Sequence, residues 1–176
     1  MPKQVPILIS ACLLGERVRY DGRHKLDPFL LEKLKKIARW VPVCPEVGCG
    51  LSVPREPMNL KGDPATPRLA GVKTGTDYTE RMSEWLKVRL LEMEPLGLCG
   101  YVCKKNSPSC SGMGRIDVFD DAGNATGAGT GIFTKAFMER FPRVPVEEEG
   151  RLRDPQAMEA FLYKVVALRR DRGAGG

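Results

Sequence analysis

The chain has 176 residues, of which 42% are apolar and 28% are charged; this length fits one domain with one hydrophobic core, and this composition excludes a disordered chain. The first apolar run is too short for a signal peptide, and no stretch approaches the roughly 20 apolar residues of a membrane span, so we expect a cytoplasmic protein with no membrane partner. The net charge of +6 favours a phosphate-bearing or nucleic-acid partner, although the basic clusters at 33–36 and 169–172 are typical of solvated helix faces.

A strand–helix–strand unit is predicted at the start of the chain. Residues 5–11 form a short apolar run rich in Val and Ile, which predicts a buried strand that ends at Cys12. Residues 27–39 begin with Asp-Pro, a helix cap followed by a proline in the first turn, and they carry apolar residues on one face. Residues 40–44 predict the second strand. Because the strands of such a unit are parallel, we expect Cys12 and Cys44 at the same edge of the sheet.

A long loop, a second helix and a third strand are predicted next. Residues 45–76 are dense in Gly and Pro and show no sustained period, which predicts a long ordered loop close to a functional site. Residues 77–97 carry a helical apolar pattern that ends at Pro-Leu-Gly, and residues 98–103 predict a strand. The following loop, 104–110, then brings Cys110 to the same sheet edge.

The last third of the chain predicts a small hairpin, a helix, a fourth strand and a closing helix, at 116–124, 134–140, 144–148 and 155–168. These elements place the chain in the α/β class, with a mostly parallel sheet flanked by helices and a small hairpin insertion. We expect a single domain over residues 1–170 and a disordered tail over residues 171–176.

Cysteine is the residue type that points to chemistry. Six cysteines in a chain expected to stay in the cytoplasm are more consistent with thiols, metal ligands or catalytic groups than with disulfides. Cys44 and Cys49 are five positions apart and Cys99 and Cys103 four apart, so neither pair has the two-residue gap of zinc ribbons. Cys99 and Cys103 fall on a predicted strand, and we expect both in the core.

Cys12, Cys44 and Cys110 form a different pattern, because each follows a predicted strand or its loop. A parallel sheet would therefore bring the three thiols together although they are far apart in the sequence. Three thiolates suit a four-iron, four-sulfur cluster that keeps one iron open for chemistry, whereas electron-transfer clusters usually take four. Buried free cysteines, which behave as small apolar residues, are the alternative on spacing alone.

Two further features are a glycine-rich segment and the single histidine. Residues 127–131 precede a predicted helix, where backbone N–H groups can hold an anion, but they lack the spacing and the position of the dinucleotide-binding fingerprint. A turn that lets the backbone pass close to the site is the better interpretation. His24 has no clear partner, and we expect it at the surface.

Three motifs resemble those of the thiouracil desulfidase family, which was long regarded as a domain of unknown function. They are Ser10–Gly15 with Arg19–Gly22, Val43–Val47, and Ser107–Cys110. The resemblance extends over nearly the whole chain, and three motifs in one order are far more specific than one alone. It implies a Rossmann-like α/β fold and a four-iron, four-sulfur cluster held by three cysteines.

The resemblance assigns roles to five residues of this sequence. Cys12, Cys44 and Cys110 match the cluster ligands of the family. Glu46 matches its catalytic acidic residue, and Ser107 matches the serine that contacts the substrate.

Two positions depart from the family pattern. Cys49 stands where glycine is usual, and Asn59 stands where an acidic residue is common. Cys49 is therefore a candidate fourth thiolate that would close the vacant iron.

The activity that the resemblance implies is the desulfuration of a thiolated pyrimidine, such as 2- or 4-thiouracil or its nucleotide. The vacant iron would bind the thiocarbonyl sulfur, Glu46 would move protons, and water would replace the sulfur, which leaves as hydrogen sulfide without a change of redox state. The alternatives are desulfuration of 4-thiouridine in transfer RNA, which the net charge favours, a non-enzymatic iron–sulfur carrier or redox sensor, and a zinc-bound structural module.

Overall fold

A parallel sheet forms the centre of the molecule, whose computed structural model describes residues 4–173. Its strand order is β2-β1-β5-β8, and each neighbouring pair is parallel. The strands are β1 (Val5–Ser10), β2 (Ala38–Val43), β5 (Gly100–Cys103) and β8 (Val146–Glu148). The expected α/β fold with a mostly parallel sheet is confirmed.

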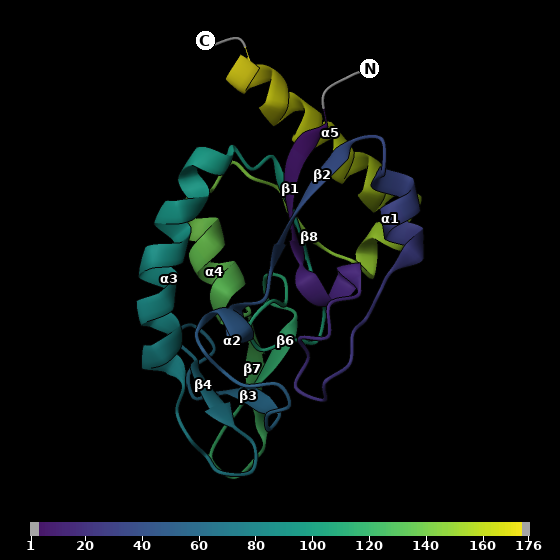
Figure 1. Ribbon diagram of the computed structural model, residues 1–176. Coiled ribbons are helices and arrows are strands. Elements are labelled where there is room, and N and C mark those ends of the chain that lie inside the picture. Colours follow the sequence, from purple (N-terminus) through teal and green to yellow (C-terminus); the bar gives the residue numbers. More distant parts are fainter. Residues whose placement is uncertain (1–3, 174–176) are drawn as a thin grey trace.

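Helices cover both faces of this sheet (Figure 1). On one face lie α1 (Pro28–Leu34) and α5 (Pro155–Gly173), and on the other lie α3 (Thr79–Met93) and α4 (Ile132–Arg140). The central strand β1 is buried on both sides, since Ile7 and Ile9 join the core with α1 and α5, whereas Leu8 joins the core with α3 and α4. This double burial explains why its sequence is a continuous apolar run.

A second sheet, in the order β4-β3-β6-β7, was not predicted in full. Its strands are β3 (Met58–Lys61), β4 (Arg68–Gly71), β6 (Ile116–Phe119) and β7 (Ala125–Gly129). The pairs β3–β4 and β6–β7 are antiparallel, and β3 joins β6 in parallel. The predicted hairpin is therefore one half of a larger sheet, which lies beyond the lower end of the central sheet in Figure 1.

The prediction of one long loop over 45–76 was wrong, because this segment also contains the short helix α2 (Pro45–Gly48) together with β3 and β4. Strands of four residues are too short to show a clear alternation in the sequence. They are held by buried side chains instead, since Leu60 and Leu69 are fully enclosed.

Two element ends also differ from the prediction. Helix α1 stops at Leu34 rather than near residue 39, because β2 already begins at Ala38, opposite Val5 of β1. Helix α5 continues to Gly173, so residues 171–173 are helical rather than disordered. The rest of the predicted tail, 174–176, lies outside the described residues.

Other local signals are found as expected. The Asp27 carboxylate accepts a hydrogen bond from the Leu30 N–H at 3.0 Å, which caps the start of α1. Short 3-10 turns follow β1 and precede α5, at Ala11–Leu14 and Arg151–Arg153. Over residues 4–173, the structure contains no helix that has both the length and the apolar character needed to cross a bilayer.

Candidate active site

A cavity of about 730 Å³ opens at the carboxyl edge of the central sheet. Its lining comes from segments that are far apart in the sequence: the end of β1, the start of α2, and the loop that follows β5. Cys12, Cys44 and Cys110 all line this cavity, as do Glu46 and Ser107. The structure therefore brings together the five residues that the sequence analysis singled out.

Cys12, Cys44 and Cys110 are free cysteines that form no disulfide bond with a residue in the range 4–173. Burial raises the pKa of Cys12 to about 11 and the pKa of Cys110 to about 12. Burial also raises the pKa of Cys44, and a thiolate at Cys44 raises the pKa of each of the other two. Burial thus favours the neutral thiols, and a metal centre that binds them as thiolates would replace their protons.

The arrangement differs from a site for a single ion. Among the side chains of residues 4–173, no group of three His, Cys, Asp or Glu residues is placed to hold one metal ion. A four-iron cluster takes each thiolate on a different iron, so its ligands stand farther apart than those of one zinc ion. The zinc alternative thus gains no support from the described residues.

Glu46 lies in the first turn of α2, and two side chains from other segments hold its carboxylate. Its Oε2 accepts a hydrogen bond from Arg55 Nε at 2.7 Å and pairs with Arg55 Nη2 at 2.6 Å. Its Oε1 accepts a hydrogen bond from the Ser109 hydroxyl at 2.9 Å. Both members of the ion pair are nearly buried, with exposed fractions of 8% for Arg55 and 12% for Glu46. The carboxylate is therefore held in one position at the cavity wall.

The sequence analysis missed Arg55 and Ser109. Ser109 belongs to the motif Ser107–Cys110, but nothing in the local sequence marks it as a partner of Glu46. Arg55 comes from the segment that was read as loop, and its guanidinium also donates to the carbonyl of Val18 at 2.8 Å. No spacing rule connects these side chains to Glu46, since only the folded chain brings them together.

Ser107 organises the loop that carries Cys110. Its Oγ accepts hydrogen bonds from the N–H groups of Ser109 at 3.3 Å and Cys110 at 3.1 Å. Its own N–H donates to Ser111 Oγ at 2.8 Å. The hydroxyl lines the cavity with its hydrogen still available, so the predicted contact to a substrate is compatible with this second, structural role.

The glycine-rich segment supports the same loop. Gly131 lies directly before α4, and a Cβ there would stand 2.6 Å from the backbone of Ser109 and Ser111. The first N–H groups of α4, from Ile132 and Phe133, donate to loop carbonyls at 3.0 Å. These groups are thus already used. The predicted close passage of the backbone is found at Gly131, but the prediction of a turn over 127–131 was wrong, because residues 127–129 lie in strand β7.

Acidic residues at the end of β8 fix the other side of the loop. The Glu149 carboxylate accepts hydrogen bonds from Lys104 Nζ at 2.6 Å and from the Lys105 N–H at 2.8 Å. Glu148, which is buried, accepts one from the Gly112 N–H at 2.9 Å. The loop around Cys110 is therefore anchored along its whole length.

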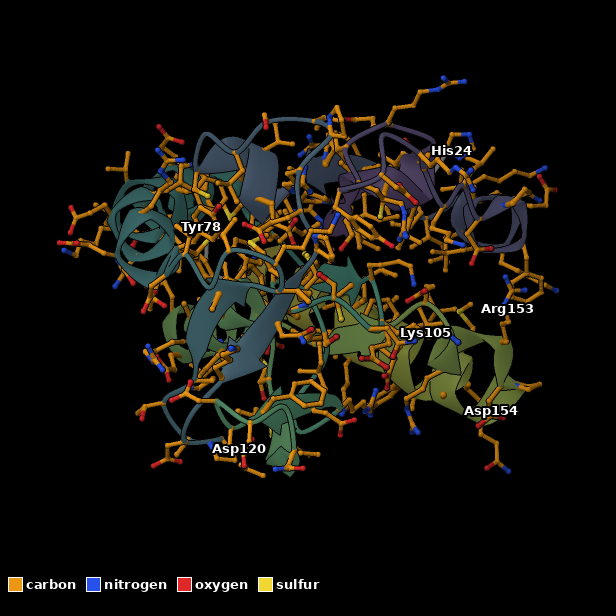
Figure 2. The ribbon with its side chains drawn as sticks, turned by 90° about the horizontal axis from the view of Figure 1, so that it is seen from below. His24, Tyr78, Lys105, Asp120, Arg153 and Asp154 are labelled. Atoms are coloured by element: carbon orange, nitrogen blue, oxygen red, sulfur yellow. The ribbon has the colours of Figure 1, made fainter. Side chains whose placement is uncertain are left out.

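Cationic side chains border the cavity. Arg153 pairs with Asp27 at 3.0 Å, whereas Lys25 and Lys105 form no ion pair with any residue in the range 4–173. Figure 2 shows Lys105 and Arg153 between the segment that carries His24 and the start of α5 at Asp154. Free ammonium groups at this border favour an anionic ligand.

The remaining sequence candidates lie elsewhere. Cys49 does not line the cavity, and its thiol donates to the Glu46 carbonyl at 3.3 Å. Cys99 and Cys103 are fully buried, as expected for core residues. His24 is exposed, and its Nδ1 accepts a hydrogen bond from the Leu26 N–H at 3.2 Å, in agreement with its predicted surface position.

Two buried polar atoms have no hydrogen-bond partner within the described chain: Arg19 Nε and the Tyr101 hydroxyl. Arg19 lines the cavity and its Nε lies 3.4 Å from the Asp21 carboxylate, whereas Tyr101 is buried in the core and does not line the cavity. An unsatisfied buried polar group costs about 1–3 kcal/mol, so such groups are rare unless something else binds them. The donor set of three free thiols that converge on one cavity fits an iron–sulfur cluster.

Comparisons with known proteins identify the family of the chain. The family model described as 2-thiouracil desulfurase matches residues 7–149. The uncharacterized protein YbbK of Bacillus subtilis (strain 168) is 35% identical over 118 residues, which cover 62% of this chain and 75% of YbbK. A solved structure described as the 4Fe-4S-dependent thiouracil desulfidase TudS superposes with a TM-score of 0.68 at 30% identity, covering 92% of this chain and 99% of TudS. The chain belongs to the 2-thiouracil desulfurase family.

Proposed function

We propose that this protein is an iron–sulfur-dependent desulfidase that replaces the sulfur of a thiolated pyrimidine by oxygen and releases hydrogen sulfide. The observation that carries the proposal is the convergence of three free thiols, Cys12, Cys44 and Cys110, on one cavity beside a clamped carboxylate. The family membership and the described cofactor of TudS support the same assignment.

In this proposal the three cysteines hold a four-iron, four-sulfur cluster, and Cys49 is not a ligand because its thiol lies outside the cavity lining. When bound in this way, the cluster supplies one open iron, a Lewis acid with affinity for a soft thiocarbonyl sulfur. We also assign the protein to the cytoplasm, where thiols stay reduced.

Side chains of the cavity activate the water molecule and transfer its protons. Glu46 accepts a proton from the water whose oxygen attacks the ring carbon, and it returns that proton to the departing sulfur. Arg55 pairs with one carboxylate oxygen at 2.6 Å, and the Ser109 hydroxyl donates to the other at 2.9 Å, so the carboxylate keeps one orientation at the cavity wall. Ser107 donates its hydroxyl hydrogen to an oxygen or nitrogen of the pyrimidine ring.

The overall reaction is balanced without an electron donor or acceptor. Water supplies the oxygen of the new carbonyl group and two hydrogens, and the carbon–sulfur bond breaks as the sulfur takes both hydrogens. The chemistry is therefore hydrolytic and leaves no oxidised or reduced product.

The substrate is a small molecule in this proposal, because the cavity of about 730 Å³ is of the size that encloses a small ligand. The ammonium groups of Lys25 and Lys105, which form no ion pair within the described part of the chain, favour the nucleotide form, whose phosphate they can bind. The same two lysines favour the second candidate, 4-thiouridine in transfer RNA, for which binding would weaken steeply with salt.

The test is sulfide release from thiouracil, from thiouridine monophosphate and from thiolated transfer RNA, using anaerobically reconstituted protein. Glu46→Gln should lower the rate by about 100-fold or more, which is the usual contribution of a general acid–base group. Glu84→Gln is the matched control, since its carboxylate is exposed and, within residues 4–173, pairs only with Lys87 on the surface of α3. Full activity of Glu46→Gln, or no sulfide from any of the three substrates, would overturn the proposal.

A further inference from the structure

A second cavity, on the outer surface of α5, takes no part in the proposed reaction. It is a groove of about 840 Å³ lined by α1 and α5, which cover the same face of the central sheet (Figure 1). Tyr163 and Val166 of α5 and Phe29 of α1 line this groove, and all three are exposed, Tyr163 by 76%. Large apolar side chains that are grouped on a surface in this way mark an interaction site.

Four residues of α5 form a straight stripe along this groove: Glu159, Tyr163, Val166 and Arg170. Their spacing of four, three and four positions is that of a coiled-coil seam, so they stay within about 60° of one another around the helix. The two charged residues lie at the ends of the stripe, about three turns apart, and the two apolar residues lie between them. A second helix can therefore lie along the stripe and contact all four side chains.

The charges of the groove indicate what kind of partner fits it. Glu159 and Arg170 form no ion pair with any residue in the range 4–173. Two other charged side chains of the groove, Arg153 and Asp171, are already in ion pairs within the chain, at 3.0 and 2.5 Å. Lys33 Nζ lies 5.8 Å from the centre of a neighbouring aromatic ring. The groove thus offers unpaired charges of both signs, which disfavours a uniformly anionic partner such as a membrane surface or a nucleic acid.

We infer that a second copy of this chain occupies the groove, with the two α5 helices antiparallel about a two-fold axis midway between Tyr163 and Val166. Glu159 and Arg170 are equally far from that midpoint along the sequence. The two-fold axis therefore places Glu159 of each copy opposite Arg170 of the partner subunit, and Tyr163 opposite Val166 of the partner subunit. A parallel pair of helices would instead place like charges opposite each other. This inference does not depend on the proposed function.

The test measures the mass of the reconstituted protein by sedimentation over a range of concentrations. The parent should approach the mass of two chains as its concentration rises. Glu159→Arg should weaken this association by about tenfold or more, because two attractive contacts become repulsive, and Arg170→Glu should do the same. The controls Glu84→Arg and Lys87→Glu make the same charge changes on the exposed surface of α3, and they should associate like the parent.

A mixture of the two α5 variants separates specific pairing from a general effect of charge. Glu159→Arg mixed with Arg170→Glu should form a heterodimer about as stable as the parent dimer, because opposite charges again face each other at both ends. The inference would be overturned by dimers that ignore both charge reversals, or by a mixture that associates no better than its components.

A parent protein that stays a single chain at every concentration would also overturn the inference, whether or not it binds vesicles of anionic lipid instead. Sulfide release measured on the same samples keeps this outcome apart from the desulfidase proposal, which requires no second copy.

Discussion

The ion pair between Arg55 and Glu46 provides the sharpest test of how the site is built. Arg55→Ala removes two short contacts to the carboxylate, at 2.7 and 2.6 Å, and leaves Glu46 with only the Ser109 hydroxyl. Breaking a fully buried ion pair costs about 3–5 kcal/mol. Because the pair faces a cavity that water can enter, we expect a smaller loss of about 1–3 kcal/mol in the free energy of unfolding.

Denaturant unfolding of the metal-free protein measures this loss, and sulfide release measures its functional consequence. Arg68→Ala is the control, because Arg68 pairs with Asp77 at 3.5 Å while both side chains are about half exposed. Its loss should be about 0–1 kcal/mol. Arg55→Lys should recover stability better than activity, since one ammonium cannot reproduce the fork of a guanidinium.

The reasoning would be refuted if Arg55→Ala cost no more stability than Arg68→Ala. It would also be refuted if Arg55→Ala kept full activity, since the orientation of Glu46 would then not depend on the clamp. A double variant, Arg55→Ala with Glu46→Gln, should cost clearly less than the sum of the two single changes. Full additivity would mean that the two side chains do not interact in solution.

Two further predictions concern the loop and β8. Gly131→Ala places a Cβ 2.6 Å from the Ser109 backbone, so it should lower the free energy of unfolding in denaturant by about 1–3 kcal/mol. Gly173→Ala is the control and should be neutral, because nothing lies within 4 Å of a Cβ at that position. Equal stabilities of the two variants would contradict the close approach at Gly131. Burial raises the pKa of Glu147, but hydrogen bonds from Arg115 and from the backbone lower it overall below its usual 4.5. This carboxylate therefore stabilises the fold above about pH 4.5, and that contribution is lost as the pH falls through the depressed value. Arg115→Ala should flatten the decline of unfolding free energy between neutral pH and pH 3, and an unchanged slope would count against the pair.

The placement of the cysteines could be predicted from the sequence because it follows from strand topology. A parallel unit brings the ends of its strands to one edge, and the observed register, which ends with Ser10 opposite Val43, puts Cys12 and Cys44 there. Strand β5 ends at the same edge, and the loop that follows it brings Cys110 into the cavity lining. Short hydrophobic runs were sufficient to predict these strands, and an Asp-Pro pair was sufficient to predict the start of the helix between the first two.

The second sheet and the clamp could not be predicted in this way. Strands of four residues, such as β3 and β4, carry too few positions for a period, and their pairing depends on contacts with β6 far along the chain. The bond between Ser109 and Glu46 joins residues 63 positions apart. Side-chain contacts of this kind arise from the packed fold and leave no local signature in the sequence.

The most direct test of the central claim is the iron and sulfide content of anaerobically reconstituted cysteine variants. The account predicts about four irons and four sulfides per chain in the parent protein, as in a four-iron cluster. Cys12→Ala, Cys44→Ala and Cys110→Ala should each lose the cluster, whereas the control variants Cys49→Ala and Cys99→Ala should retain it, because those thiols lie outside the cavity. A full cluster in any of the first three variants, or loss of the cluster in Cys49→Ala, would contradict the assignment of the ligands.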